Sequence, residues 1–196
     1  MTIAVIDRPV TTGGEETILA AIEAPDAALA IWTRRLAPLF EAILATLDLD
    51  RLDDVVINLD AGTSIHAALA EAGYPNDAAA LLAADIDRLV HRQSRLTSVQ
   101  RLTVKLEVIE TDACRRFHAD YVTLRLLCTY IGPATQWCHA DAPETIHALA
   151  TGEVGVFKGR RLLDPPPILH RSPPILATGG RRLMLVIDPA RSPDDL

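Results

Sequence analysis

Residues 114–137 read CRRFHADYVTLRLLCTYIGPATQW, and this stretch decides the fold that we expect. His118 and Asp120 stand two positions apart at the start of a predicted strand, so their side chains project from one face, about 6 to 7 Å apart along the backbone. Two side chains at that spacing can share one metal ion. The alternation predicts that this face continues, opposite Arg125 and Thr129, as a largely apolar row: Val122, Leu124, Leu126, Cys128 and Tyr130. Such a face is typical of the inside of a barrel with a polar mouth.

Further strands are predicted on both sides of this stretch. Residues 101–112 (RLTVKLEVIETD) alternate polar and apolar side chains, which indicates a strand with one buried face. Residues 152–158 (GEVGVFK) and 182–188 (RLMLVID) are two more candidate strands, and residues 144–150 (ETIHALA) predict a turn of helix. Short strands separated by Gly and Pro favour an antiparallel sandwich or barrel.

The N-terminal half has a different composition, rich in Ala and Leu. Apolar residues at spacings of three and four predict a helix over 26–47, which Pro38 should kink or split. Residues 53–62 suggest a strand or a buried extended link, residues 64–72 a short helix, and residues 76–95 a longer one. Residues 1–12 suggest a short strand or a loose arm.

These patterns together predict an α+β protein. We expect a mainly helical N-terminal part, residues 1–98, packed as a layer on a C-terminal double-stranded β-helix of the cupin or jelly-roll kind, residues 99–196. The two parts should depend on each other and form one structural unit.

A third candidate metal ligand, His170, follows in the segment ILHRSPPILATGG. Two histidines and one carboxylate make the facial triad of non-haem Fe(II) oxygenases, which leaves three coordination positions for the co-substrate and dioxygen. The alternatives without a metal are a surface ion pair or a strand-end cap for His118 and Asp120 and a polar loop residue for His170.

The order of elements after residue 113 resembles that of the Fe(II)/2-oxoglutarate-dependent dioxygenases, which have the double-stranded β-helix fold, and of their prolyl-hydroxylase branch. The resemblance covers residues 114–188 and rests on His118-Ala119-Asp120, Arg125 to Tyr130, Gly155-Val156-Phe157, His170, Pro173-Pro174 and Gly179-Gly180-Arg181. It implies an enzyme that hydroxylates an unidentified substrate with Fe(II) and 2-oxoglutarate, its iron held by His118, Asp120 and His170. The loop after Tyr130 lacks the Gly-Gly-Glu turn common in prolyl hydroxylases, so the substrate class does not carry over.

The same resemblance implies where 2-oxoglutarate would bind. Arg181 would pair bidentately with its distal carboxylate, and Tyr130 would add a hydrogen bond. The interval from His170 to Arg181 is slightly longer than usual, so Arg182 is an alternative anchor, on the opposite face of the strand. Arg125 is a weaker candidate for the same role.

The strings of residues 114–137 and GGRRLMLVID also resemble a bacterial family of unknown function that is associated with zinc-homeostasis genes and metallochaperone GTPases. That resemblance implies a non-catalytic zinc-binding protein as the alternative function, with the same triad holding Zn(II). Zinc also accepts thiolates, so Cys114, Cys128 and Cys138 are further candidate ligands, although no CxxC pair exists. A cupin-like binding module without metal is a third hypothesis.

Composition excludes several other classes. The 196 residues carry a net charge of −7, which argues against nucleic acid as a partner, because phosphate binding needs clustered Lys and Arg. No apolar run reaches the roughly 20 residues that cross a bilayer, and residues 1–10 (MTIAVIDRPV) carry an acid in their apolar stretch and no cation before it, unlike a signal peptide. Three cysteines favour a reducing compartment, so we expect a cytoplasmic protein. The substrate is a small molecule or a protein, and a homodimer is left open.

Overall fold

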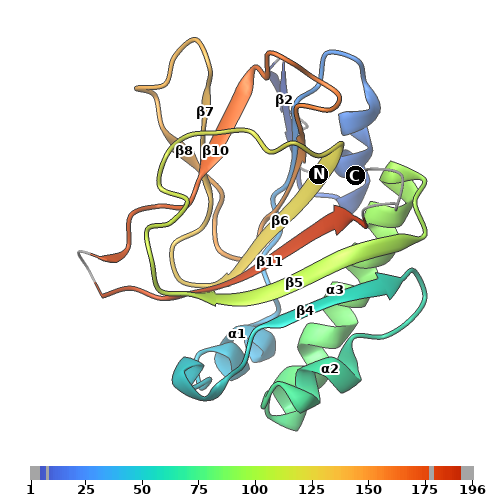
Figure 1. Cartoon of the computed structure of the whole chain (residues 1–196), viewed down its shortest axis with the longest axis vertical. Coiled ribbons are helices and arrows are strands. Elements are labelled where there is room, and N and C mark those ends of the chain that lie inside the picture. The colour runs from blue at the N-terminus through green and yellow to red at the C-terminus, as the bar shows by residue number, and fades with distance from the viewer. Residues whose placement is uncertain (1–4, 8, 177–178, 191–196) are drawn as a thin grey trace.

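Strands of both halves of the chain form two sheets that face each other (Figure 1). This is seen in a computed structural model that describes residues 5–7, 9–176 and 179–190. In the larger sheet, all neighbouring strands are antiparallel except β2 and β3. Its order across the sheet is β1 (Val5–Asp7), β2 (Val10–Gly13), β3 (Leu29–Trp32), β9 (Val154–Lys158), β6 (Leu124–Ile131), β11 (Arg182–Pro189), β5 (Arg101–Ile109) and β4 (Val55–Asp60).

The smaller sheet lies at the upper left of Figure 1 and has the order β10 (Ile168–Arg171), β7 (Gln136–His139), β8 (His147–Ala148). His118, in the segment between β5 and β6, adds to its β10 edge through an isolated antiparallel bridge with His170. The segment around His118, which the sequence pattern had indicated as important, therefore lies along the edge of the smaller sheet.

Helices cover the face of the larger sheet that points away from the smaller one. They are α1 (Pro38–Leu44), α2 (His66–Glu71) and α3 (Asn76–Thr97), with two 3₁₀ helices, η1 (Glu16–Glu23) and η2 (Leu49–Arg51). The Gln93 side chain of α3 reaches the sheet and donates to the carbonyl of Leu124 at 3.0 Å. None of the described helices is long and apolar enough to cross a lipid bilayer.

Strand β11 shows how the larger sheet serves two cores. Leu183, Leu185 and Ile187 pack with the helices, whereas Met184 and Val186 pack in a second cluster between the sheets. That second cluster also contains Leu127 of β6, Trp137 of β7 and Phe157 of β9. Alternate side chains of one strand are thus buried on both faces, and the second face lines the space in which the site lies.

The prediction of one helix over 26–47 is wrong at its start, because Leu29–Trp32 is strand β3. All four of its side chains are buried, and it pairs with β2 on one side and β9 on the other. A strand buried on both faces has a continuous apolar run, which periodicity cannot distinguish from a buried helix. Pro38 divides the region by opening α1, a position where its missing N–H costs nothing.

The predicted helical turn over 144–150 is also wrong, since His147–Ala148 is strand β8, paired with β7. Strands β7 and β10 lie in stretches where no strand was predicted. Confirmed are the strands at 53–62, 101–112, 152–158 and 182–188 and the helices at 64–72 and 76–95. The strand expected to end at Gly132-Pro133 is also present, but it begins at Leu124, so His118 and Asp120 do not stand at its start. Residues 1–98 also supply β1 to β4 of the larger sheet, so this half is not a purely helical layer.

Candidate metal centre

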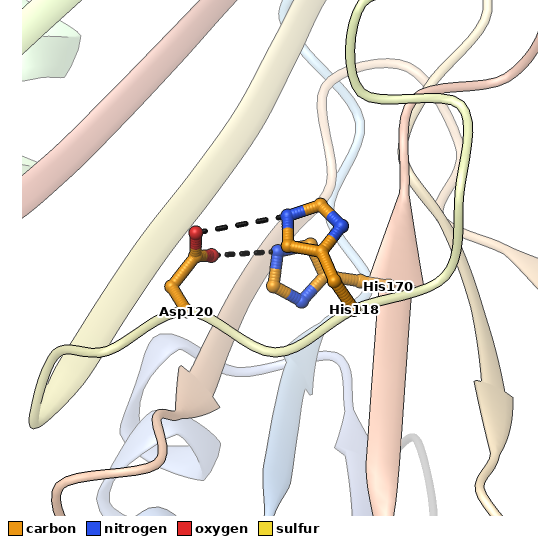
Figure 2. Close-up of side chains that lie close together, drawn as sticks. All are labelled: His118, Asp120 and His170. Carbon is orange, nitrogen blue, oxygen red and sulfur yellow. Dashed lines mark ion pairs between the residues drawn. The ribbon is translucent and has the colours of Figure 1, made fainter.

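His118, Asp120 and His170 lie together between the two sheets. One ligand atom from each residue lies within 4.8 Å of the other two, and these three are the group of possible metal ligands that the described residues bring together. Figure 2 shows the Asp120 carboxylate facing both imidazole rings. His118 Nε2 is 3.6 Å from Asp120 Oδ1, and His170 Nε2 is 2.9 Å from Asp120 Oδ2.

Backbone pairing sets the two rings beside each other. The N–H of His118 donates to the carbonyl of His170 at 3.0 Å, and the N–H of His170 donates back at 2.8 Å. The ring centroids are 4.8 Å apart, and the Phe157 ring of β9 lies 4.8 Å from that of His170. His170 is therefore buried against an apolar wall, while His118 is partly exposed.

The segment after Asp120 is held by the chain that follows β9. The N–H of Arg160 donates to the carbonyl of Asp120 at 2.9 Å, and the N–H of Gly159 donates to that of Thr123 at 2.8 Å. The backbones approach so closely that a Cβ at position 159 would lie 2.2 Å from the carbonyl oxygen of Val122 and 2.8 Å from that of Asp120. Glycine at 159 is thus required for this path of the chain.

The charges of the three side chains suit a cation between them. Burial raises the pKa of Asp120, but its contacts with the two histidines and the charge of Arg125 hold it well below its usual value. The contact with Asp120 raises the pKa of His118, whereas burial lowers that of His170. Asp120 is therefore ionised, and His170 favours its neutral form.

The hydrogen bonds of the triad leave ligand atoms free for a metal. His118 Nδ1 lies 2.9 Å from the carbonyl oxygen of Arg116, which can only accept, so Nδ1 carries a proton and Nε2 faces the carboxylate. Asp120 Oδ2 is buried beside Arg125 Nη1 and His170 Nε2 without an aligned hydrogen bond, while Oδ1 faces His118 Nε2 at 3.6 Å. A metal-binding histidine usually donates the N–H of its other ring nitrogen to a carboxylate, a backbone carbonyl or water, and the Nδ1 of His118 has such a carbonyl partner in Arg116. The residues present therefore fit a divalent metal.

Arg125 joins this group from β6. Its Nη1 is 2.6 Å from Asp120 Oδ2, and its Nε and Nη2 donate to the two carboxylate oxygens of Asp188 at 2.8 and 2.7 Å. The pairing of Asp188 with Arg125 was not predicted from the sequence. The alternation along β11 could have indicated it, because it places Asp188 on the same face as Arg182.

Arg182 is a fully buried cation on the face of β11 that lines the space between the sheets. It donates to the carbonyl of Pro133 at 2.6 Å and to the hydroxyl of Ser172 at 2.8 Å, with longer contacts to Thr129 and Thr135. No carboxylate among the described residues pairs with it. Burial lowers its pKa to about 10. A buried cation without a counter-ion is costly, so an anion in this position would stabilise it.

Arg181 and Tyr130 lie away from the triad. Arg181 pairs at the surface with Asp50 at 2.6 Å and with Glu110 at 3.0 Å. The Tyr130 hydroxyl donates to Asp85 at 2.7 Å, in the core under the helices. The even-numbered residues of β6 thus do not share the face of the triad, because residues 121–123 bend before the strand begins and break the alternation.

The remaining candidate ligands are spread through the fold. Cys128 and Cys138 are buried, and Cys114 is exposed, but none of them belongs to the group around Asp120. Cys114 instead lines a pocket of about 490 Å³ formed by residues 112–116 and His118. Its thiol also lies close enough to Arg182 to oppose the fall in pKa of that guanidinium. The pocket is therefore lined both by His118 of the triad and by Cys114, which lies near Arg182.

Solved structures with the same fold include dioxygenases of low sequence identity. A rice dioxygenase for auxin oxidation superposes with a TM-score of 0.55 at 15% identity, over 96% of this chain and 85% of its own. The Arabidopsis thaliana dioxygenase for auxin oxidation 1, in a binary complex with 2-oxoglutarate, gives 0.55 at 8% identity, over 95% and 93%. A full-length Neurospora crassa protein, solved in complex with alpha-KG, gives 0.52 at 13% identity, over 96% and 87%.

Comparison with curated protein sequences finds no match. The family described as protein of unknown function DUF1826 matches residues 13–188, which is most of the chain and includes the triad, Arg125 and Arg182. The chain therefore belongs to the DUF1826 family, and it has the fold of these dioxygenases.

Proposed function

We propose that this protein is an Fe(II)- and 2-oxoglutarate-dependent dioxygenase that hydroxylates a small molecule or a protein. The proposal rests on two features that lie in the same space between the two sheets. A triad of two imidazoles and one carboxylate lies between the sheets, and Arg182, a buried arginine that has no carboxylate partner among the described residues, lies on the same side of β11. Two solved structures of the same fold are complexes with 2-oxoglutarate or alpha-KG.

In this proposal His118, Asp120 and His170 hold the iron, a donor set that leaves coordination positions open. Iron held there would supply the activation of dioxygen: one oxygen atom would go to succinate as 2-oxoglutarate loses carbon dioxide, and the other would be inserted into a C–H bond of the substrate. The carbonyl of Arg116 fixes the proton of His118 on Nδ1. Phe157 keeps water from the buried face of His170.

We assign the distal carboxylate of 2-oxoglutarate to Arg182 rather than to Arg181. Arg182 is linked to the triad through Ser172, which accepts its hydrogen bond and follows β10, the strand that carries His170. Arg181 already has two acidic partners at the surface. A guanidinium binds a carboxylate through two parallel hydrogen bonds, and of these two arginines only Arg182 lacks an acidic partner.

The test is an anaerobic titration of 2-oxoglutarate into the Fe(II)-loaded protein. We expect one Fe(II) per chain, a visible charge-transfer band when 2-oxoglutarate is added, and succinate when air is admitted. Fe(II) binding without a band and without succinate would overturn the proposal.

The zinc-binding alternative uses the same three residues. Two histidines and one carboxylate are also a common zinc donor set. The same purification decides between the two, since zinc held at one ion per chain against an excess of Fe(II), with no response to 2-oxoglutarate, would favour the non-catalytic function. The described cysteines lie outside the triad, so thiolate ligation forms no part of this alternative.

A further inference from the structure

Arg125 stands between two carboxylates that the fold brings from different parts of the chain. Asp120 comes from the segment before β6, and Asp188 comes from the end of β11. Asp188 receives two parallel hydrogen bonds from the guanidinium, which leaves Nη1 for Asp120. All five donors of a guanidinium lie in one plane, so a bidentate partner also fixes the directions of the donors that remain, the two on Nη1 among them.

The three side chains are sheltered from solvent. The exposed fractions are 20% for Arg125, 20% for Asp120 and 12% for Asp188. Burial lowers the pKa of Arg125, but the two carboxylates outweigh this and raise it, so the guanidinium stays charged. A sheltered charged pair with good geometry is rigid, and breaking it leaves an uncompensated charge.

A carboxylate ligand needs such support because it can rotate and can offer a metal one oxygen or both. Asp120 precedes the bend at residues 121–123 and lies outside any strand, so regular sheet pairing does not fix its side chain. Arg125 Nη1 contacts one of its two oxygens, Oδ2. A guanidinium on one oxygen limits rotation of the carboxylate and favours binding of the metal through a single oxygen.

We propose that Arg125, itself held by Asp188, is a positioning residue that orients Asp120 for the metal. This inference rests on the proposed function only in so far as Asp120 is a metal ligand, and it holds for iron and zinc alike. It assigns to the Arg125–Asp188 pair a role in metal affinity beyond fold stability.

The chain supplies a matched control for the stability contribution. Arg34 also forms a bidentate pair, with Asp85, at 2.5 and 2.7 Å, and it too is largely buried. That pair lies on the other face of the larger sheet, where Tyr130 also contacts Asp85. Replacing Arg34 with lysine therefore removes a similar buried pair without touching Asp120.

The experiment measures the affinity of the whole chain for Co(II) and Zn(II) by competition with a chelator, for the wild type, Arg125→Lys, Arg125→Gln, Asp188→Asn and Arg34→Lys. Metal affinity should fall about 10- to 100-fold in the Arg125 variants, the range typical of residues that orient a metal ligand. Asp188→Asn should give a smaller fall, because it acts through Arg125. The visible spectrum of bound Co(II) should change in the Arg125 variants, and Arg34→Lys should leave affinity and spectrum as in the wild type.

Thermal unfolding of the metal-free proteins separates positioning from folding. Arg125→Lys and Arg34→Lys should lose similar stability, and only the former should lose metal affinity. Wild-type affinity and an unchanged Co(II) spectrum in folded Arg125 variants would overturn the inference while leaving the proposed function intact. If both Arg125 variants fail to fold, unchanged affinity in Asp188→Asn overturns it. A wild-type protein that binds no divalent metal would overturn the proposed function itself.

Discussion

His118 and His170 are hydrogen-bonded to each other through their backbones in both directions, at 3.0 and 2.8 Å, although they belong to distant parts of the chain. The pairing that extends the smaller sheet is therefore the same pairing that sets two candidate metal ligands side by side. Asp120 follows His118 by two residues and so reaches both rings. Backbone pairing thus places two members of the triad, whereas the Asp120 side chain has a contact with Arg125.

Replacing His118 with alanine should remove metal binding but leave the fold intact. The ring is partly exposed, and the backbone bridge to His170 does not need the side chain. Loss of a direct ligand should lower affinity by more than the roughly 100-fold found for supporting residues. Equilibrium dialysis with Zn(II) and far-UV circular dichroism check the two halves of this prediction.

His147→Ala is the matched control for that variant. His147 is an exposed histidine of the smaller sheet that stacks on Trp137 at 4.2 Å, outside the triad. The His147→Ala variant should bind Zn(II) as the wild type does. Equal loss of metal in both variants would show that exposed histidines in general, and not the triad, hold the ion.

Gly159→Ala should damage the centre from a distance. The added Cβ would meet the backbone carbonyls of Val122 and Asp120 at 2.2 and 2.8 Å, and backbone cannot move aside as a flexible side chain can. We expect a loss of about 1 to 3 kcal/mol in the free energy of unfolding, as for overpacking, together with weaker metal binding. Chemical denaturation and the Zn(II) competition assay measure both.

Gly13→Ala provides the comparison for this glycine. A Cβ at position 13 would meet the Ile18 side chain at 3.0 Å, and that side chain can shift. Gly13 lies in β2, a strand that carries no residue of the triad. This variant should lose less stability and keep wild-type metal affinity. If Gly159→Ala also kept wild-type affinity, the path of residues 120–123 would not depend on the close approach at Gly159.

The stability of the metal-free protein should depend on Glu16 above about pH 4 to 5. Glu16 of η1 pairs with Arg88 and Arg92 of α3. Burial raises the pKa of Glu16, but its two arginine partners outweigh this and lower it. A lowered folded-state pKa contributes stability above the unfolded-state value, and this is lost as pH falls through the folded-state value.

Glu16→Gln should therefore be less stable than the wild type at pH 7, by up to about 1 kcal/mol because Arg88 is largely exposed. The difference should shrink as pH falls below about 4. Urea denaturation at pH 7, 5 and 3.5 checks the trend. A difference that stays constant with pH would mean that the Glu16 charge contributes nothing.

The sequence predicted the triad better than it predicted its surroundings. His118, Asp120 and His170 could be chosen because their residue types and order are distinctive, and the structure brings them together. Which face of β6 points toward the triad was harder to predict, because the alternation that starts at Asp120 is interrupted by the bend at residues 121–123. That interruption exchanges the two faces of β6 and brings Arg125, rather than Tyr130, beside Asp120.

The missed strands have a related cause. β3 is buried on both faces, so its apolar run carries no period of two. β7 and β8 are short and gain their extended form from pairing with each other and with β10, contacts that local sequence does not encode. The helix α3 and the strand β5 were predictable because each keeps one clear period over many residues.

Of the two neighbouring arginines, Arg182 and not Arg181 should bind the distal carboxylate of 2-oxoglutarate. In the metal-loaded protein without oxygen, 2-oxoglutarate should raise the unfolding temperature, by the equivalent of about 2.7 kcal/mol at a hundredfold excess over its dissociation constant. Arg182→Lys keeps the charge but loses bidentate pairing, so its affinity should fall at least about tenfold, or 1.4 kcal/mol. Arg181→Lys should behave as the wild type, because its partners Asp50 and Glu110 lie at the surface. Pyruvate, a 2-oxo acid without a distal carboxylate, should bind both variants equally; a fall in pyruvate affinity for Arg182→Lys, or a fall in 2-oxoglutarate affinity for Arg181→Lys alone, would contradict the assignment.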